Sequence, residues 1–212
     1  SVTSGSGKDT IIGDNGIINQ NTSGVITDAF TISLDIGGKD VISAGHGDNT
    51  IFGGFESDLI TSLSGNDIIT GDNGIAIFTS GHLTTLDSTD LDDSTGAADI
   101  INAGDGQNKI IAGAGPDEVT AGIGDDHVLG DHGTITYTVD DKLVEIKDKL
   151  PNLGDDDLIS LSDGDNVVIA GFGDDVVTTG LGDDHIIGDN GEIHYDANAR
   201  ISRIFNDPLD IG

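Results

Sequence analysis

A frame of nine residues recurs through the chain and limits what it can fold into. Thirteen units fit the frame, and every unit has Asp or Asn at position five and Ile or Val at position seven. Position three is Gly in ten units, and three units follow one another without a break in Ser162–Gly188. Short-period internal repetition is typical of stacked architectures, so the frame predicts a solenoid instead of a globular core.

Each unit predicts a polar turn followed by a very short strand. Gly accepts the left-handed backbone of a tight turn, and a β-branched residue between two turns indicates a short buried strand. Two units then make one coil of 18 residues with a turn at each end. An array of this kind has a thin core of stacked Ile and Val, in keeping with six Phe, two Tyr and no Trp in 212 residues.

The units resemble the G-G-x-G-x-D-x-U-x nonapeptides of the repeats-in-toxin (RTX) family. The resemblance covers somewhat more than half of the chain and leaves out three inserts and the C-terminal tail. It implies a calcium-binding parallel β-roll in an extracellular protein, secreted or at the cell surface, of the kind exported by type I secretion. Glu56, Ala97 and Asp155 replace the Gly of position three, and we expect these turns to bind metal poorly or with altered geometry.

A longer period groups the units into blocks. The turn Gly-Asp-Asn-Gly at Gly13 returns at Gly71, Gly130 (with His for Asn) and Gly188, at spacings of 58, 59 and 58 residues. We therefore predict one continuous array over residues 1–212. Its super-repeats are 14–71, 72–130 and 131–188, with partial repeats 1–13 and 189–212. The fold class is all-β: a parallel β-roll or β-solenoid of stacked calcium-binding coils, with a β-hairpin or enlarged-coil insertion every 58–59 residues.

The hairpin form of the inserts makes a definite pairing prediction. In the third insert, a two-residue turn at Asp140-Asp141 would pair Tyr137 with Val144 and Ile135 with Ile146. The corresponding turns of the earlier inserts are Ser23-Gly24 and Ser80-Gly81. An enlarged coil of the same solenoid is the alternative, and with either form we expect almost no helix.

The charge of the chain is concentrated in short carboxylates. The formal net charge is −31, and 35 of the 39 acidic residues are Asp. Coils of 18 residues stack position five on position five about 4.8 Å apart, and like charges at that spacing repel unless a cation lies between them. Ca²⁺ suits such a site because it accepts roughly six to eight oxygen ligands in flexible geometry, whereas Mg²⁺ demands a rigid octahedron.

We therefore predict calcium ligands at position five of every unit and at the aspartate of each Gly-Asp-[Asn/His]-Gly turn. The predicted ligands are Asp9, Asp14, Asp40, Asn49, Asp58, Asp67, Asp72, Asp99, Asn108, Asp117, Asp126, Asp131, Asp157, Asn166, Asp175, Asp184 and Asp189. The predicted stacked pairs are Asp40/Asp58, Asn49/Asp67, Asp99/Asp117, Asn108/Asp126, Asp157/Asp175 and Asn166/Asp184. The alternative is that these side chains only cap their turns, which needs no metal.

Composition argues against several other functions. The chain has no Cys and no H-E-x-x-H motif, so we predict neither a thiol nucleophile nor a zinc protease site, and no enzyme activity. The net charge argues against nucleic acid as a partner. No apolar run approaches the roughly 20 residues of a membrane span. We interpret the six His as solvent-facing strand residues, although His127 and His185 occupy matching positions.

A solenoid that copies itself makes length and stiffness more readily than a pocket. We therefore expect a calcium-rigidified structural segment of a secreted or cell-surface protein, such as an adhesin stalk or a matrix fibre. The alternatives are an accessory module of an extracellular enzyme and a solenoid that binds polysaccharide or ice, although position two offers no regular ice-binding array.

The two ends of the sequence suggest a segment of a longer protein. Leu209–Gly212 repeats Leu34–Gly37, so a new block begins where the chain stops. Either a parent chain continues the stack, or separate chains stack end to end with calcium at the shared turns. A head-to-tail contact of the second kind does not close and gives filaments.

Overall fold

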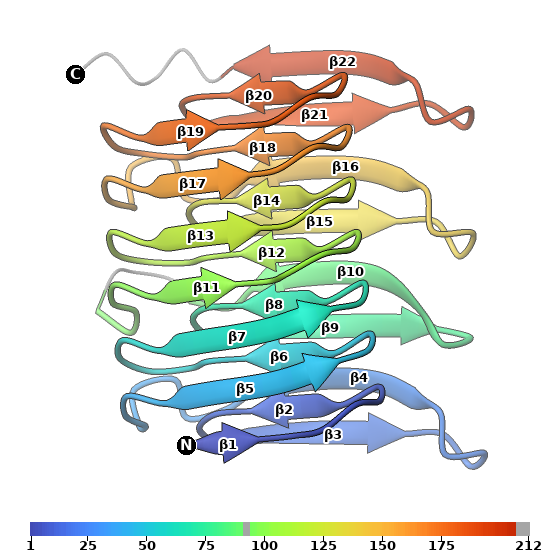
Figure 1. Cartoon of the computed structure of the whole chain (residues 1–212), viewed down its shortest axis with the longest axis vertical. Helices are drawn as coiled ribbons and strands as arrows, with labels where there is room; N and C mark the ends of the chain where they lie inside the picture. The colour runs from blue at the N-terminus through green and yellow to red at the C-terminus, as the bar shows by residue number, and fades with distance from the viewer. Residues whose placement is uncertain (91–93, 207–212) are drawn as a thin grey trace.

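The computed structural model describes residues 1–90 and 94–206, which form twenty-two β-strands and no helix. The strands stack along the long axis of the molecule in three sheets (Figure 1). Sheets A and B are parallel and have seven strands each, and sheet C is antiparallel and has eight. The tetrapeptide Leu209–Gly212 lies outside the described residues.

Sheets A and B take alternate nonapeptides. The strands of sheet A, in spatial order, are β1 (Val2–Thr3), β5 (Val41–His46), β7 (Leu59–Ser64), β11 (Ile100–Asn102), β13 (Glu118–Ala121), β17 (Leu158–Leu161) and β19 (Val176–Thr178). Those of sheet B are β2 (Thr10–Ile12), β6 (Thr50–Phe52), β8 (Ile68–Thr70), β12 (Lys109–Ile111), β14 (His127–Leu129), β18 (Val167–Ile169) and β20 (His185–Ile187). The predicted parallel β-roll is confirmed.

The register stacks equivalent positions of the frame on one another. Ile101 pairs with Ile60 on one side and with Val119 on the other. These position-seven residues are fully buried and form one continuous core cluster between sheets A and B. Ala residues at position nine, such as Ala112, belong to the same cluster. The interior of the roll is therefore a ladder of Ile, Val and Ala, as the thin-core prediction requires.

The inserts are β-hairpins and not enlarged coils. The three insert hairpins are β3 (Gly16–Gln20) with β4 (Ile26–Thr31), β9 (Gly74–Thr79) with β10 (His82–Ser88), and β15 (Gly133–Tyr137) with β16 (Leu143–Asp148). The C-terminal tail forms a fourth hairpin, β21 (Gly191–Tyr195) with β22 (Ile201–Asn206). Each hairpin also pairs with the next one, through β4–β9, β10–β15 and β16–β21. Sheet C is thus assembled from hairpins that are far apart in the sequence.

Sheet C covers the outer face of sheet B. Phe52, Ile111 and Leu129 of sheet B belong to one buried cluster with Leu86 and Ile135 of sheet C. Sheet B is therefore buried on both faces, whereas sheet A keeps an exposed face on which Val41 and Val176 are about half exposed, at 47% and 55%. Burial on both faces is typical of parallel strands, and it requires apolar side chains at successive positions.

The predicted hairpin register is right in one part and wrong in another. Ile135 pairs with Ile146 as predicted, but Tyr137 pairs with Leu143 and not with Val144. The register shifts after Thr136, and the connection is longer than the predicted two residues. Within it, the Asp141 N–H donates to the Thr138 carbonyl oxygen (3.1 Å).

The turns predicted in the two earlier inserts are both present. Ser80-Gly81 is a two-residue connection in which both residues have positive φ, 56° and 88°, the backbone of a type I′ turn. Ser23-Gly24 lies in the connection between β3 and β4, where the Gly24 N–H donates to the Asn21 carbonyl oxygen (3.0 Å).

Position three of the frame has two backbone conformations. Gly106 has φ of 130°, and a Cβ there would lie 2.0 Å from the carbonyl oxygen of Gly65 in the neighbouring coil. Glu56 also has positive φ, at 67°. Ala97, Asp155 and Gly38, which stand in the first unit of each block, do not. Two of the three departures from Gly are therefore unstrained, because the turn that follows an insert has a different shape.

This difference predicts that Gly→Ala changes stability unequally at two sites that occupy the same position of the repeat. Gly106→Ala should destabilise the fold by at least about 1–2 kcal/mol, because the added Cβ meets a left-handed backbone and a neighbouring carbonyl. Gly38→Ala should have little effect, because nothing lies within 4 Å of a Cβ there. Thermal melts in saturating calcium would measure both, and equal melting temperatures would contradict the two-conformation description.

Candidate metal centre

The position-five side chains form two columns, one along each edge of the roll. The acidic column stands directly before the strands of sheet A and consists of Asp40, Asp58, Asp99, Asp117, Asp157 and Asp175. The mixed column stands directly before the strands of sheet B and consists of Asp9, Asn49, Asp67, Asn108, Asp126, Asn166 and Asp184. Every member of the acidic column is an Asp, whereas the mixed column alternates Asp with Asn.

One hydrogen bond repeats along both columns. The backbone N–H of each residue donates to Oδ1 of its neighbour in the next coil, for example from Asp99 to Asp117 (2.7 Å) and from Asn108 to Asp126 (2.8 Å). All six predicted pairs are stacked in this way. The ladder also crosses the inserts, since the Asp58 N–H donates to Asp99 Oδ1 (2.7 Å). Each column is therefore continuous across the block boundaries.

The second carboxylate oxygens of the acidic column have no hydrogen-bond partner. Within the described residues, the buried and unpartnered atoms of this column are Oδ2 of Asp58, Asp99, Asp117, Asp157 and Asp175. Asp99 is 1% exposed and Asp117 is 2% exposed. A buried polar atom without a partner loses its solvation with nothing in return. A row of such oxygens is what a cation would coordinate.

The turn aspartates of three blocks reach into the same edge of the roll. Oδ2 of Asp14 accepts the N–H of Phe55 (2.7 Å), and Oδ2 of Asp72 accepts the N–H of Ala114 (2.5 Å). Asp131 makes the equivalent contact with the N–H of Phe172. Oδ1 of Asp72 and Oδ1 of Asp131 are buried without a partner, like the column oxygens. Asp189, the fourth predicted turn ligand, is exposed.

Ala97 and Asp155 take part in this arrangement. Burial raises the pKa of Asp72 and Asp131, and the nearby backbone N–H groups of Ala97 and Asp155 lower it; at the matching place the Gly38 N–H donates to Oδ1 of Asp14 (3.0 Å). In the first unit of a block, the backbone N–H at position three thus lies against the aspartate of the turn that precedes the insert. This explains why the first unit of a block does not need the left-handed Gly.

Burial raises the pKa of the carboxyls along this edge. It raises the pKa of Asp99 and of Asp157 to about 8, and that of Asp58 to about 7. Burial, followed by the charge of Asp157, raises the pKa of Asp131 to about 9. The pKa of Asp117 also lies well above its usual range, because of burial and then the charges of Asp99 and Asp157. The metal-free edge therefore resists full ionisation at neutral pH.

The mixed column is satisfied in a different way. The amide nitrogen of Asn49 donates to Asp67 Oδ1 (3.0 Å) and to the Gly47 carbonyl oxygen (2.7 Å). Asp67 Oδ2 accepts the Ser62 hydroxyl (2.5 Å). Asn108 and Asn166 repeat the contacts of Asn49 in the next two blocks. Among the described residues of this column, Asp126 Oδ2 is the buried side-chain oxygen without a partner.

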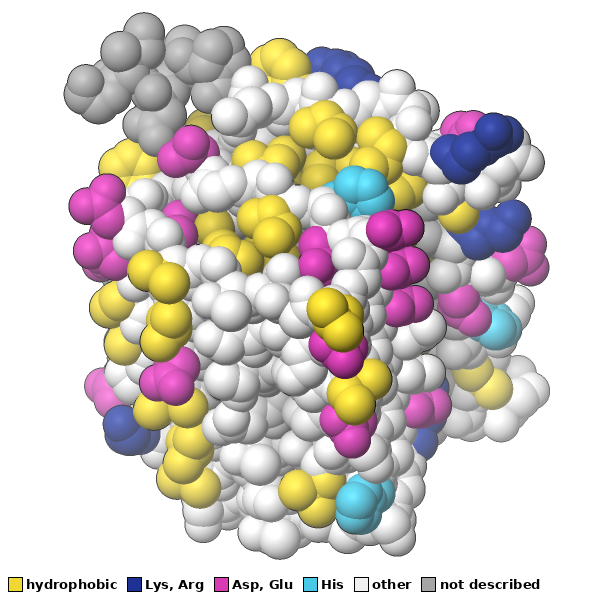
Figure 2. Space-filling model, turned by 45° about the horizontal axis from the view of Figure 1, so that its top comes forward, with side chains coloured by type: hydrophobic (Ala, Val, Ile, Leu, Met, Phe, Trp, Pro, Cys, Tyr) yellow, Lys and Arg dark blue, Asp and Glu magenta, His cyan; other side chains and the backbone are white. Residues whose placement is uncertain are grey.

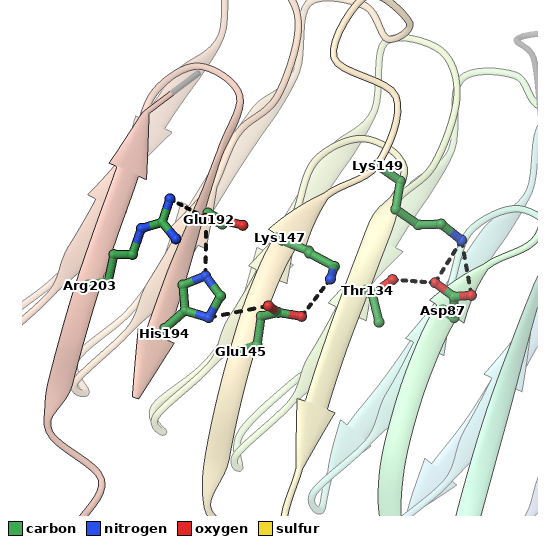
Figure 3. Close-up of polar contacts among 8 residues, drawn as sticks. All are labelled: Asp87, Thr134, Glu145, Lys147, Lys149, Glu192, His194 and Arg203. Atoms are coloured by element: carbon green, nitrogen blue, oxygen red, sulfur yellow. Dashed lines mark hydrogen bonds and ion pairs between the residues drawn. The ribbon is translucent and has the colours of Figure 1, made fainter. Parts of the chain in front are cut away.

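Charged groups on sheet C are paired, in contrast to those of the acidic column. Glu145, His194 and Glu192 form a chain of contacts of 3.2 and 3.1 Å, flanked by Lys147 and Arg203 (Figure 3). Within the described residues, the ion pair that reaches the acidic column comes from the Ser1 amino group to Asp40 (3.3 Å). On the face drawn in Figure 2, Lys and Arg lie at the margins. Ser1 and Lys39 thus bring positive charge to the part of the acidic column formed by Asp40, Asp58 and Asp99.

Two features of this region were not predicted from the sequence. Asp90 is buried at 2% exposure and accepts a hydrogen bond from the Asn73 amide (3.1 Å), and it lies two residues after β10. The corresponding residues after β4 and β16 are Ser33 and Leu150, so the repeat gave no signal for it. Two of the six His are not solvent-facing as interpreted. His132 is fully buried, and His127 stacks on Tyr137, with its Nδ1 2.6 Å from the tyrosine oxygen. The sequence alternates His127 with the buried Val128, and this pattern alone does not show that sheet C covers His127.

The comparison with known families agrees with this geometry. The model of the RTX calcium-binding nonapeptide repeat, which spans four copies, matches residues 1–17, 37–60, 45–75, 93–133 and 160–192. These matches cover more than half of the chain, which therefore belongs to the RTX calcium-binding repeat family. The segment is accordingly a calcium-binding repeat segment, and proteins that carry this repeat are typically secreted. Neither the curated proteins nor the solved structures contain a match to the chain.

The structure gives no sign of a helical membrane anchor in the part of the chain that it describes. None of its described residues forms a helix that is long and apolar enough to cross a bilayer.

The raised pKa values predict that acid stabilises the metal-free chain. A carboxyl whose folded-state pKa is raised favours folding fully below its unfolded pKa and loses that contribution as pH rises through the folded value. With a usual value of 3.8 and folded values of about 7 to 9, the window runs from about pH 4 to about pH 9. Metal-free protein should show more β-strand by circular dichroism at pH 5 than at pH 8.

A substitution control assigns this effect to the column. In Asp58→Asn with Asp99→Asn the pH dependence should weaken, because two of the raised carboxyls are gone. Asp140→Asn, in the exposed hairpin connection, should leave the pH dependence as it is. Identical spectra of the unaltered chain at pH 5 and pH 8 would show that the buried carboxyls do not control folding.

Proposed function

We propose that this chain is a structural segment of a secreted or cell-surface protein, such as an adhesin stalk or a matrix fibre, made rigid by Ca²⁺ between its coils. The observation that carries the proposal is the row of buried, unpartnered aspartate oxygens on the acidic column. Calcium is the ion that fits, because short carboxylates and turn carbonyls provide hard oxygen ligands in flexible number.

Metal binding would turn the edge that charge repulsion destabilises into the edge that contributes most to the stability of the fold. Without an ion, Asp99 faces the charges of Asp58 and Asp72 across neighbouring coils. An ion between coils replaces this repulsion by coordination to both, so each pair of coils is joined along the solenoid axis. Stiffness along the axis then follows from the number of stacked sites and requires no large core.

The segment has no catalytic role of its own in this proposal. Most carboxyls with a strongly raised pKa, such as Asp99 and Asp157, are stacked along the acidic column, and their Oδ1 atoms or those of their neighbours accept backbone N–H groups. Nucleic acid is not a partner, because a net charge of −31 repels a phosphate backbone. The proposal does not include insertion into a membrane. It does include export by type I secretion.

Calcium-dependent folding is the direct test. Because binding to the folded state alone adds stability by mass action, chelation with EGTA at pH 7.5 should remove most of the β-strand signal in circular dichroism. Millimolar calcium should restore it, and magnesium at the same concentration should restore it less well. A β-rich spectrum that EGTA leaves unchanged would overturn the proposal.

Two variants separate coordination from bulk charge in the same assay. Asp117→Ala removes a ligand that is 2% exposed within the column and should lower both the melting temperature in calcium and the number of bound ions. Asp140→Ala removes the same charge from an exposed hairpin connection and should change neither. Equal effects of the two substitutions would mean that only the total charge matters.

End-to-end self-association is a further part of the proposal. Strands β1, β2 and β3 form one end of the three sheets, and β19, β20 and β22 form the other, so each end offers three unpaired strand edges within the described chain. Such edges recruit other strands, and a head-to-tail contact extends into a filament. Light scattering should show the mass rising with protein concentration in millimolar calcium and falling in EGTA. A monomeric mass throughout would rule out the filament and leave the calcium proposal intact.

A further inference from the structure

The two edges of the roll differ in how their turn oxygens are satisfied. In the mixed column the amide nitrogen of Asn108 lies 3.1 Å from the Gly106 carbonyl oxygen, 3.3 Å from that of Gly104 and 2.9 Å from Asp126 Oδ1. Asn166 makes the matching contacts with Ser162, Gly164 and Asp184, at 3.3, 3.2 and 3.0 Å. Turn carbonyls and a stacked carboxylate are the oxygens that a calcium ion would bind between coils. The carboxamide NH₂ therefore lies among the oxygens that would bind an ion between these coils.

The acidic column has no equivalent donor. Its position-five residues are all Asp, so a side chain there can accept hydrogen bonds but cannot donate one when it is ionised. Each complete block adds two carboxylates to this column and a third from the turn aspartate, as in Asp72, Asp99 and Asp117. The same block adds one Asp and one Asn to the mixed column. Unpartnered oxygens thus accumulate mainly on the acidic edge, and among the described residues of the mixed column the buried one is Oδ2 of Asp126.

The aspartates of the acidic edge are buried, which distinguishes them from ordinary exposed acidic residues and points to a bound ligand. Asp99 and Asp117 are 1% and 2% exposed, and each has an Oδ2 atom without a partner. Asp72 and Asp131, at 2% and 3% exposure, add unpartnered Oδ1 atoms beside them. Four such side chains on one edge favour a bound cation, because the charge of Lys39, which acts on Asp58 and Asp99, leaves their Oδ2 atoms without a hydrogen-bond partner.

We propose that calcium binds along the acidic column alone and that Asn49, Asn108 and Asn166 replace the metal in the mixed column. This inference rests on the proposed calcium-binding role and deepens it, because it assigns the ions to one edge of the roll. The acidic edge is also where every hairpin leaves the roll, since Asp72 lies two residues before β9 and Asp131 two residues before β15. Calcium therefore holds the base of each sheet C hairpin, while the opposite edge holds together without metal.

Two matched double variants test the assignment. Asp99→Asn with Asp157→Asn removes two charges from the acidic column, and Asp67→Asn with Asp126→Asn removes two from the mixed column. Asn keeps an oxygen at the position of Oδ1, so the N–H ladder is retained in both. Native mass spectrometry in a fixed excess of calcium counts the ions on the folded chain. The first variant should lose at least one ion per chain, and the second should lose none.

The reverse substitution covers the case in which the first variant fails to fold. Asn108→Asp converts a carboxamide bridge into a stacked carboxylate, so it should bind at least one additional ion and should need a higher calcium concentration to reach half of its β-strand signal. Equal ion losses in the two double variants, or an unchanged calcium midpoint and ion count in Asn108→Asp, would overturn the one-edge assignment. If the unaltered chain retains no calcium and folds equally well in EGTA, the proposed function itself fails, which is a different outcome.

Discussion

The structure depends on the stacking of one carboxylate on the next at the spacing of parallel strands. The backbone N–H of each position-five residue donates to the side chain in the following coil, as from Asp157 to Asp175 (2.9 Å). The same bond that fixes the turn geometry therefore brings like charges together in a buried place. The Ile and Val ladder between sheets A and B is only one side chain thick from each sheet, so it cannot easily absorb that repulsion. If calcium binds along the acidic column as proposed, folding and metal binding are coupled at that edge of the molecule.

Two kinds of charge balance coexist in one small fold. On the outer face of sheet C, Glu145 is paired with Lys147 and Glu192 with Arg203, and both glutamates contact His194 within about one strand spacing (Figure 3). Pairs of this kind are partly exposed, respond to salt and contribute little stability each. The acidic column has instead almost exclusively acceptors, and it is buried. The unpartnered Oδ2 atoms of this buried column are the observation on which the proposed cation site rests.

Much of the fold was predictable because each nonapeptide has the same residue types at the positions that form its turn and its strand. The inner ladder and the stacked pairs follow from positions three, five and seven, and the spacing of the inserts follows from the 58-residue period. The sequence left open whether the inserts are hairpins or enlarged coils. The third layer was missed, although position eight contains the signal: it is polar in sheet A, as in Ser43 and Thr120, and apolar at most places in sheet B, as in Phe52 and Ile111. The bulge before Tyr137 and the buried Asp90 depend on contacts within single inserts, so no repeat could reveal them.

The 58-residue period has a physical basis, because it lets all three sheets grow by the same number of strands per block. A block such as residues 14–71 contributes β5 and β7 to sheet A, β6 and β8 to sheet B, and the hairpin β3–β4 to sheet C. Each sheet thus grows by two strands per block, and all strands keep nearly the same separation of about 4.8 Å. One hairpin per coil would crowd sheet C, and one hairpin per three coils would open gaps in it and expose the apolar outer face of sheet B. An insert after every second coil is therefore the spacing at which sheet C stays continuous along the whole roll.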